Sequence, residues 1–148
     1  MNLINQINEG IKEAMKSRQT DRLRALRGIK SAFLLLQTGE GVSEVTDEMC
    51  IKALQKMCKQ RKDSIEIFEK QQREDLAIIE RSELEVIDSF LPAQLSEDEL
   101  NQLIVHLLTE NGLTEKASMG KAMALAIQNF GDKADGKLIS KIIKDFLV

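Results

Sequence analysis

The sequence predicts an all-α, multihelical protein that is divided into two helical subdomains. Its 148 residues are 43% hydrophobic but only 3% aromatic, and they include no tryptophan or tyrosine. Leu, Ile, Ala, Met, Glu and Lys dominate, and these residues favour helices over strands. The single proline, Pro92, restricts the residue before it and interrupts the helical pattern. We therefore expect an N-terminal subdomain over residues 1–91 and a C-terminal subdomain over residues 92–148.

The N-terminal subdomain is expected to begin with two amphipathic helices. The first has apolar residues at three- and four-residue steps: Leu3, Ile4, Ile7, Ile11 and Met15. It should end near Lys16 or Ser17, and Thr20 or Asp21 can cap the second helix. The apolar side of the second helix comprises Leu23, Leu26, Ile29, Phe33 and Leu36, widened by Ala25, Ala32 and Leu35. The loop 37–43, with two glycines, ends it.

A long helical hairpin should complete the N-terminal bundle. Thr46 is a good N-cap for the helical region 47–90. One continuous helix of about 44 residues would extend about 66 Å, which fits a small protein poorly. We therefore predict two antiparallel helices that turn around residues 69–73, and a helix end near Leu91, just before Pro92.

The C-terminal subdomain is expected to contain three helices. Their predicted starts are Ser96, Ser118 and Asp135. Glu99 completes a capping box with Ser96, and Asn111-Gly112 is a left-handed end for the first of the three helices. The residues predicted to face inward are Leu100, Leu103, Ile104, Leu107 and Leu108, then Met119, Met123, Ile127 and Phe130, then Ile139, Ile142, Ile143 and Phe146.

Two glycine-lysine pairs, Gly120-Lys121 and Gly136-Lys137, lie in the first turns of the last two helices. Free amides at helix N-termini and nearby lysines bind anions such as nucleic-acid phosphates. The candidate anion site comprises Lys121, Lys133, Lys137 and Lys141. The alternative is that the glycines permit close helix packing and the lysines are simply exposed, and spacing alone favours this alternative.

A second basic feature is a ridge of Arg24, Arg27 and Lys30 on the second helix, which spacing alone assigns to salt-bridged surface rather than to phosphate contact. We expect no catalytic constellation, metal site or cofactor, because no nucleophile has a base at recognisable spacing and His106 stands alone. Cys50 and Cys58 are expected to be buried and reduced. No apolar run is long enough to span a bilayer, so we predict a cytoplasmic protein without a membrane partner.

Several stretches together resemble the YqeY-like proteins of the GatB/YqeY family. They are KQRKDSIE at 59–66, Phe68, Arg73, Asp75-Leu76, Glu83, FLPAQLS at 90–96, MGKAM at 119–123 and GDKADGKLI at 131–139. The resemblance covers the chain from its first helix to its last residues, and it implies two all-α subdomains. One departure is the turn at Gln71-Gln72, where smaller or turn-forming residues are expected in such proteins.

The resemblance also implies kinship with the tail of the B subunit of glutamyl-tRNA(Gln) amidotransferase, which grips tRNA. It therefore implies a tRNA-binding accessory module, with contact through the lysines of the C-terminal motif. The alternative is a protein–protein adaptor that docks on an amidotransferase subunit or an aminoacyl-tRNA synthetase. Carbon–nitrogen ligase activity with glutamine as nitrogen donor belongs to the wider family, and it is not expected of this chain alone because no nucleophile or nucleotide loop is visible.

Overall fold

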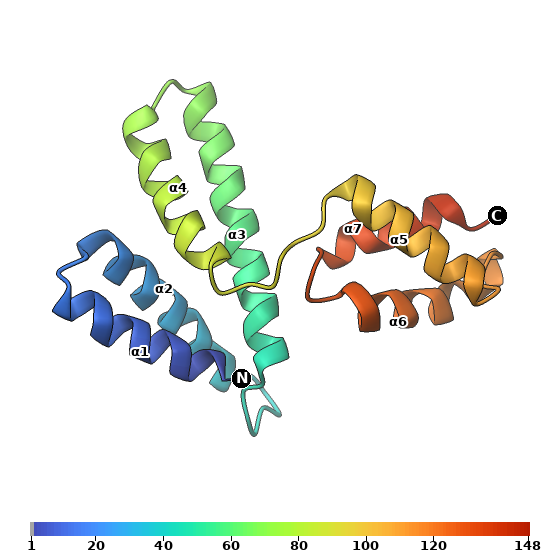
Figure 1. The fold of residues 1–148 in the computed structure, drawn as a ribbon, viewed down its shortest axis with the longest axis horizontal. Coiled ribbons are helices and arrows are strands. Elements are labelled where there is room, and N and C mark those ends of the chain that lie inside the picture. The colour runs from blue at the N-terminus through green and yellow to red at the C-terminus, as the bar shows by residue number, and fades with distance from the viewer. Residues whose placement is uncertain (1) are drawn as a thin grey trace. The chain divides into compact units, whose positions relative to one another are not determined.

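The computed structural model describes residues 2–148, which form seven α-helices and one short 3₁₀-helix and contain no strand (Figure 1). The predicted all-α fold class is confirmed. The chain divides into two compact units, Met1–Leu91 and Pro92–Val148, and each has its own hydrophobic core. Within the described residues, no helix is both long and apolar enough to cross a membrane.

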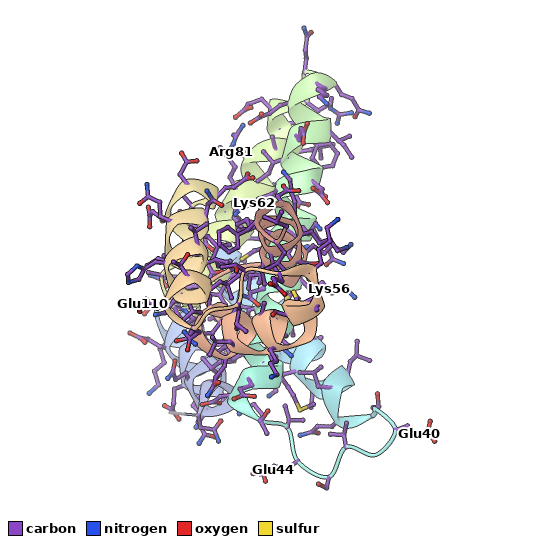
Figure 2. All side chains as sticks on the ribbon, turned by 90° about the vertical axis from the view of Figure 1, so that its right-hand side faces the viewer. Glu40, Glu44, Lys56, Lys62, Arg81 and Glu110 are labelled. Carbon is purple, nitrogen blue, oxygen red and sulfur yellow. The ribbon has the colours of Figure 1, made fainter. Side chains whose placement is uncertain are left out.

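The N-terminal unit contains α1 (Leu3–Lys16), α2 (Thr20–Gln37), α3 (Asp47–Lys70) and α4 (Glu74–Asp88). Helices α3 and α4 form the predicted antiparallel hairpin, and α2 packs against both (Figure 1). The fully buried side chains of this unit include Leu26, Ile29, Leu54 and Ile87. Loop 38–46 joins α2 to α3, and its Glu40 points away from the helices (Figure 2).

Several helix ends of the N-terminal unit agree with the sequence, and two differ. Thr46 caps α3 by accepting a hydrogen bond from the Met49 amide (3.3 Å). The cap position of α2 is Gln19, without a side-chain hydrogen bond, so the prediction of Thr20 or Asp21 as the cap is wrong. Asp21 instead lies in the first turn of α2 and pairs with Arg24 (2.8 Å). Helix α4 ends at Asp88, earlier than the predicted end near Leu91.

Two apolar residues predicted to face the N-terminal core are exposed. Met15 on α1 is 55% exposed and Leu35 on α2 is 70% exposed. On α1 the place of Met15 is taken by its neighbour Ala14, which is buried. A small side chain lets two helices approach closely, so the helix rotates to bring alanine to the contact rather than a larger neighbour.

The C-terminal unit contains α5 (Glu97–Glu110), η1 (Lys116–Ser118), α6 (Met119–Phe130) and α7 (Gly136–Phe146). Its fully buried side chains are Leu100, Ile104, Leu108, Ala122, Ala126, Ile139 and Ile143. Ser96 and Asp135 cap α5 and α7 as predicted, accepting from the Glu99 and Lys137 amides (both 3.2 Å). Ser118 precedes α6 as predicted, but it belongs to η1 and its side chain makes no capping hydrogen bond.

Two further predictions for the C-terminal unit can be compared with the structure. Gly112 follows α5 with a left-handed φ of 68°, as predicted. The prediction that Ile127 faces inward is wrong, because it is 43% exposed while Ala126 is fully buried beside it. Leu103 on α5 is likewise 40% exposed. Both helices therefore bury a narrower stripe than the periodicity indicates.

Candidate nucleic-acid interface

Helix α7 presents three lysines on one open face. Lys137, Lys141 and Lys144 follow one another at four- and three-residue steps, so they lie on the same side of the helix. Ile139, Ile142 and Ile143 on the other side are buried in the core of the unit, which fixes the lysine side outward. With Gly136, Ser140 and Asp145, the three lysines line an open depression of about 450 Å³. We call Lys137, Lys141 and Lys144 the α7 lysine face.

The start of α7 is open to solvent. A Cβ added at Gly136 would meet no atom within 4 Å, and the same holds at Gly120 in α6. The alternative that these glycines serve close helix packing is therefore wrong. The Asp135 side chain accepts from the Lys137 amide (3.2 Å), so the helix satisfies one of its own first-turn donors. A bound phosphate would have to use the lysine side chains more than the helix terminus.

Acidic groups lie close to the α7 lysine face. The Lys141 ammonium is 3.4 Å from Glu97 of α5, and Asp145 lines the same depression as the lysines. Lys141 and Glu97 are both well exposed, and exposed pairs contribute at most about 1 kcal/mol. Lys141 can therefore exchange Glu97 for a phosphate at little cost.

The four lysines predicted as one anion site do not all come together. Helices α6 and α7 are consecutive and joined only by residues 131–135, and Lys121 lies in the first turn of α6, whose 12 residues extend about 18 Å. The Lys116 amide donates to Val148 (3.3 Å), which places the start of α6 beside the end of the chain. The Lys133 carbonyl accepts from Leu95 (2.8 Å) in the segment that leads into α5. Lys133 therefore stays close to the start of α7, whereas the start of α6, which carries Lys121, lies at the opposite end of the unit near the end of the chain (Figure 1).

Lys144 was missed at the sequence level, although it lies seven residues after Lys137, a spacing that places both on one helix face. The positive charge of the basic ridge on α2 is partly neutralised, because Arg24 pairs with Asp21 at 2.8 Å and lies 3.8 Å from Glu83. This agrees with the expectation that the ridge is salt-bridged surface.

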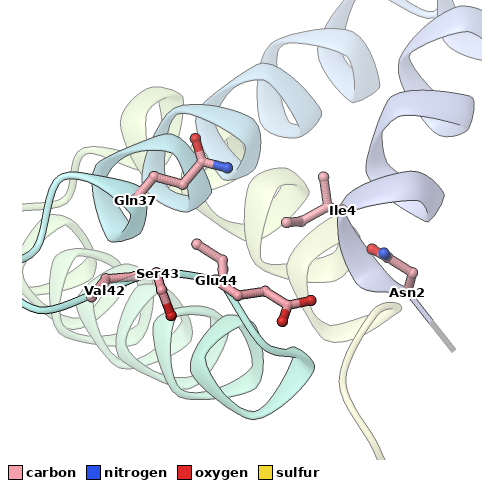
Figure 3. Close-up of a pocket in the computed structure, with 7 residues that line it drawn as sticks. Asn2, Ile4, Gln37, Val42, Ser43 and Glu44 are labelled. Carbon is pink, nitrogen blue, oxygen red and sulfur yellow. The ribbon is translucent and has the colours of Figure 1, made fainter.

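A depression elsewhere in the N-terminal unit has no chemistry of its own. It lies between the start of α1, the end of α2 and loop 38–46, with a volume of about 460 Å³ (Figure 3). Its lining residues are Asn2, Ile4, Gln37, Val42, Ser43, Glu44 and Val45. They include one carboxylate and no histidine, cysteine or lysine, so this lining offers neither a nucleophile with a base nor a metal-ligand set.

The two cysteines are buried and free, as predicted. Burial, and a hydrogen bond from the Cys58 thiol to Asp88 (3.4 Å), raise the pKa of Cys58 to about 12. Burial also raises the pKa of Cys50. Both thiols are therefore protonated at neutral pH, and a protonated thiol is a poor nucleophile. His106 is exposed and lies 3.1 Å from Glu110, and no group of three or more metal-ligating side chains gathers anywhere in residues 2–148.

Comparison with known proteins identifies relatives over nearly the whole chain. The family model described as "Yqey-like protein" matches residues 4–147. A protein of Pyrenophora tritici-repentis named "Altered inheritance of mitochondria protein 41, mitochondrial" is 29% identical over 141 residues, which cover 91% of this chain and 75% of that protein. Proteins of the same name from Clavispora lusitaniae and Lachancea thermotolerans are 31% and 35% identical, over 73% and 70% of this chain and 64% and 57% of theirs.

These relatives correct one prediction. They are named mitochondrial proteins, so the predicted cytoplasmic location is wrong. The prediction rested on the lack of a long apolar run, and this property separates aqueous compartments from membranes but not one aqueous compartment from another. The chain spans between 57% and 75% of the length of the three relatives, so the activity of those whole proteins does not transfer with the match.

Proposed function

The chain belongs to the family of Yqey-like proteins, and from this premise we propose that it is an RNA-binding module whose α7 lysine face holds the phosphate backbone of a tRNA. The observation that carries the proposal is the open face of α7, where Lys137, Lys141 and Lys144 line one depression. The choice of tRNA rests on the resemblance of the C-terminal motif to the tRNA-gripping tail of the amidotransferase B subunit.

The dimensions of the α7 lysine face suit a short run of phosphates. Lys137 and Lys144 are seven residues apart, which corresponds to about 10 Å along the helix. One strand of a duplex advances about 3.4 Å per nucleotide, so the face covers about three nucleotides. Lys133, at the start of α7, extends the same basic region. Each neutralised phosphate adds about 0.7 to 0.9 to the salt slope of the binding constant.

The proposal predicts salt-dependent binding that depends on these lysines. Fluorescence anisotropy of labelled total tRNA, and of an unrelated RNA of equal length, would be measured with the full chain across a salt series. We expect tighter binding to tRNA, and the double substitution Lys137→Gln/Lys141→Gln should lower the salt slope by about 1.4 to 1.8. Glutamine keeps the helix propensity of lysine, so the fold is retained.

A matched control removes the same charge elsewhere. Lys12 and Lys70 pair with Glu9 and Glu66 on their own helices (3.4 and 3.0 Å), so Lys12→Gln/Lys70→Gln should leave the slope nearly unchanged. Binding that ignores salt, or an equal loss in the control variant, would show that the α7 lysine face is not the contact.

A second candidate is a protein–protein adaptor, favoured by the apolar surface of the α3–α4 hairpin. Ile67, Ile78 and Ile79 are 53%, 59% and 40% exposed there. Such side chains would suit docking on an amidotransferase subunit or an aminoacyl-tRNA synthetase. A purified candidate partner that binds after nuclease treatment, and that loses binding to Ile78→Asp but not to the α7 lysine variant, would favour the adaptor over the RNA module.

A further inference from the structure

Helix α3 carries a second basic surface, which we call the α3 lysine stripe. Its members are Lys52, Lys56, Lys59 and Lys62. All four are exposed, and they follow at steps of four, three and three residues. The buried residues of the same segment are Cys50, Leu54, Met57 and Cys58. At about 100° per residue, the lysines lie within about 120° of one another and opposite this buried side.

The centre of the α3 lysine stripe, Lys56, has no acidic neighbour along the helix. Glu48, Asp63 and Glu66 lie four residues from Lys52, Lys59 and Lys62, a spacing at which they can pair, whereas no acid lies within four residues of Lys56. The positions three and four residues from Lys56 are Lys52, Ala53, Lys59 and Gln60, so its nearest charged neighbours on the helix surface are like charges. Like charges at this spacing destabilise a helix. Elsewhere the protein avoids this cost, as in the pairs Lys12–Glu9 and Lys70–Glu66.

The remaining cation of the segment is used differently. Arg61 points into the hairpin, where its Nε donates to Glu83 of α4 (2.8 Å) and lies 3.4 Å from Glu80. The segment thus separates its cations by role, because the guanidinium joins α3 to α4 while the lysines are exposed (Lys56 in Figure 2). The contacts within the hairpin therefore account for Arg61 but not for Lys56 at the centre of the stripe.

We propose that the α3 lysine stripe is a second phosphate-binding surface for RNA, carried by the N-terminal unit. The ten residue steps from Lys52 to Lys62 correspond to about 15 Å of helix, or about four nucleotides of one strand. A phosphate bound there removes the like-charge repulsion that the free helix bears. The identity of the polyanion rests on the proposed function, whereas the placement of the site does not.

An anionic membrane is a poorer ligand for this surface. A helix that binds in a membrane interface buries its apolar side in the lipid while its basic side meets the headgroups. The apolar side of α3 at this level is already in the core, with Cys50 and Leu54 fully buried. RNA needs only the lysines, so it suits the exposed surface better.

The test uses the full chain, a labelled 20-nucleotide oligouridylate and labelled total tRNA across a salt series. Lys56→Gln/Lys62→Gln should lower the salt slope for the single strand by about 1.4, because two contacts of about 0.7 each are lost. Lys12→Gln/Lys70→Gln is the control of equal charge and should change it little. Far-UV circular dichroism confirms that each variant keeps its helices.

The outcomes separate this inference from the proposed function. If the α3 variant lowers the slope and Lys137→Gln/Lys141→Gln does not, the α3 lysine stripe stands and the α7 assignment fails. If only the α7 variant lowers the slope, or neither variant does, the α3 lysine stripe is overturned. Vesicles rich in phosphatidylserine provide the third arm, since α3-dependent binding to them without binding to either RNA would overturn the assignment to RNA.

Discussion

Gln72 occupies a backbone position at which glycine should be more stable. It follows α3 with a left-handed φ of 57°, where a side chain costs about 1 to 2 kcal/mol. The hydrogen bonds around it close the helix end, since the Arg73 amide donates to Phe68 (2.8 Å) and the Gln72 amide donates to Glu69 (3.1 Å). The same double closure follows α5, where the left-handed residue is Gly112 with a φ of 68°. The two turns thus differ in the residue that carries the strain.

The substitution Gln72→Gly removes that cost but adds about 0.5 to 1 kcal/mol of chain entropy to the unfolded state. We therefore expect the free energy of unfolding of the N-terminal unit to rise by about 0.5 to 1 kcal/mol. With a urea dependence of about 1 to 2 kcal/mol per molar, the midpoint should rise by about 0.5 M. The assay is urea unfolding followed by far-UV circular dichroism at 222 nm.

Gly112→Ala is the reciprocal control, because it places a side chain at a left-handed position and should cost about 1 kcal/mol in the C-terminal unit. A midpoint that falls with Gln72→Gly would refute the reasoning. It would mean that the Gln72 side chain makes contacts worth more than the backbone strain.

Three further predictions concern the cores, a thiol and the hairpin turn. Leu54→Ala and Ile104→Ala each leave a cavity in a different core and should lower the free energy of unfolding by about 2 to 5 kcal/mol. If the units unfold independently, hydrogen exchange will show that each substitution lowers protection only in its own unit, and lower protection in both units would contradict this. The Cys58 thiol, with a pKa raised to about 12, should react with a thiol reagent at pH 8 only after unfolding, and prompt reaction of the folded protein would contradict the burial. A hydrogen bond from Arg81 lowers the pKa of Glu74, so this pair stabilises the fold above the unfolded pKa of about 4.3, and the stabilisation is lost as pH falls through the folded pKa. Arg81→Met should therefore reduce the fall in the free energy of unfolding on the acid side of the pH profile. An unchanged fall would exclude the pair as its source.

Helix ends were predictable wherever a side-chain oxygen or a glycine defines them. Thr46, Ser96 and Asp135 accept from backbone amides two or three residues later, a bond that depends only on local sequence. The end of α1 shows the limit of this reasoning. Arg18 takes a left-handed φ of 55° there, and no local preference of arginine indicates it. The tight connection to α2 fixes that conformation, so it is a consequence of tertiary structure.

The spacing of the buried residues along each helix was predictable, but which residues of the apolar stripe face the core was not. Apolar residues at three- and four-residue steps define a wide stripe, and the structure buries only its centre. Ala122 and Ala126 on α6 are fully buried, whereas the larger Ile127, next to Ala126, is 43% exposed. Close helix contacts select small residues, and which small residue meets a neighbouring helix depends on the partner's surface. A single helix pattern cannot supply that information.

The same limit applied to the anion site. Placing Lys121 with Lys137 assumed that two similar glycine-lysine turns meet in space, but consecutive helices joined by a short loop run antiparallel and put their first turns at opposite ends. Lys144 and the α3 lysine stripe required no tertiary knowledge, because periodicity within one helix places them. A charge count over residues 31–100 conceals the stripe, because the acids of residues 63–99 outweigh the lysines of residues 52–62.

An acidic protein can bind RNA if its cations are grouped on the scale of the screening length. The net charge is −3, but charges more than about 8 Å apart are largely screened at physiological salt. A phosphate therefore responds to the helix face that it touches. The α7 lysine face includes Asp145 and a lysine that faces Glu97 at 3.4 Å, whereas the centre of the α3 lysine stripe at Lys56 has no acid within one helical turn along α3. If both surfaces contact RNA, the α3 variant should lose more affinity at physiological salt than the α7 variant, and the reverse order would mean that the geometry of the phosphates, rather than local charge, decides the contribution of each surface.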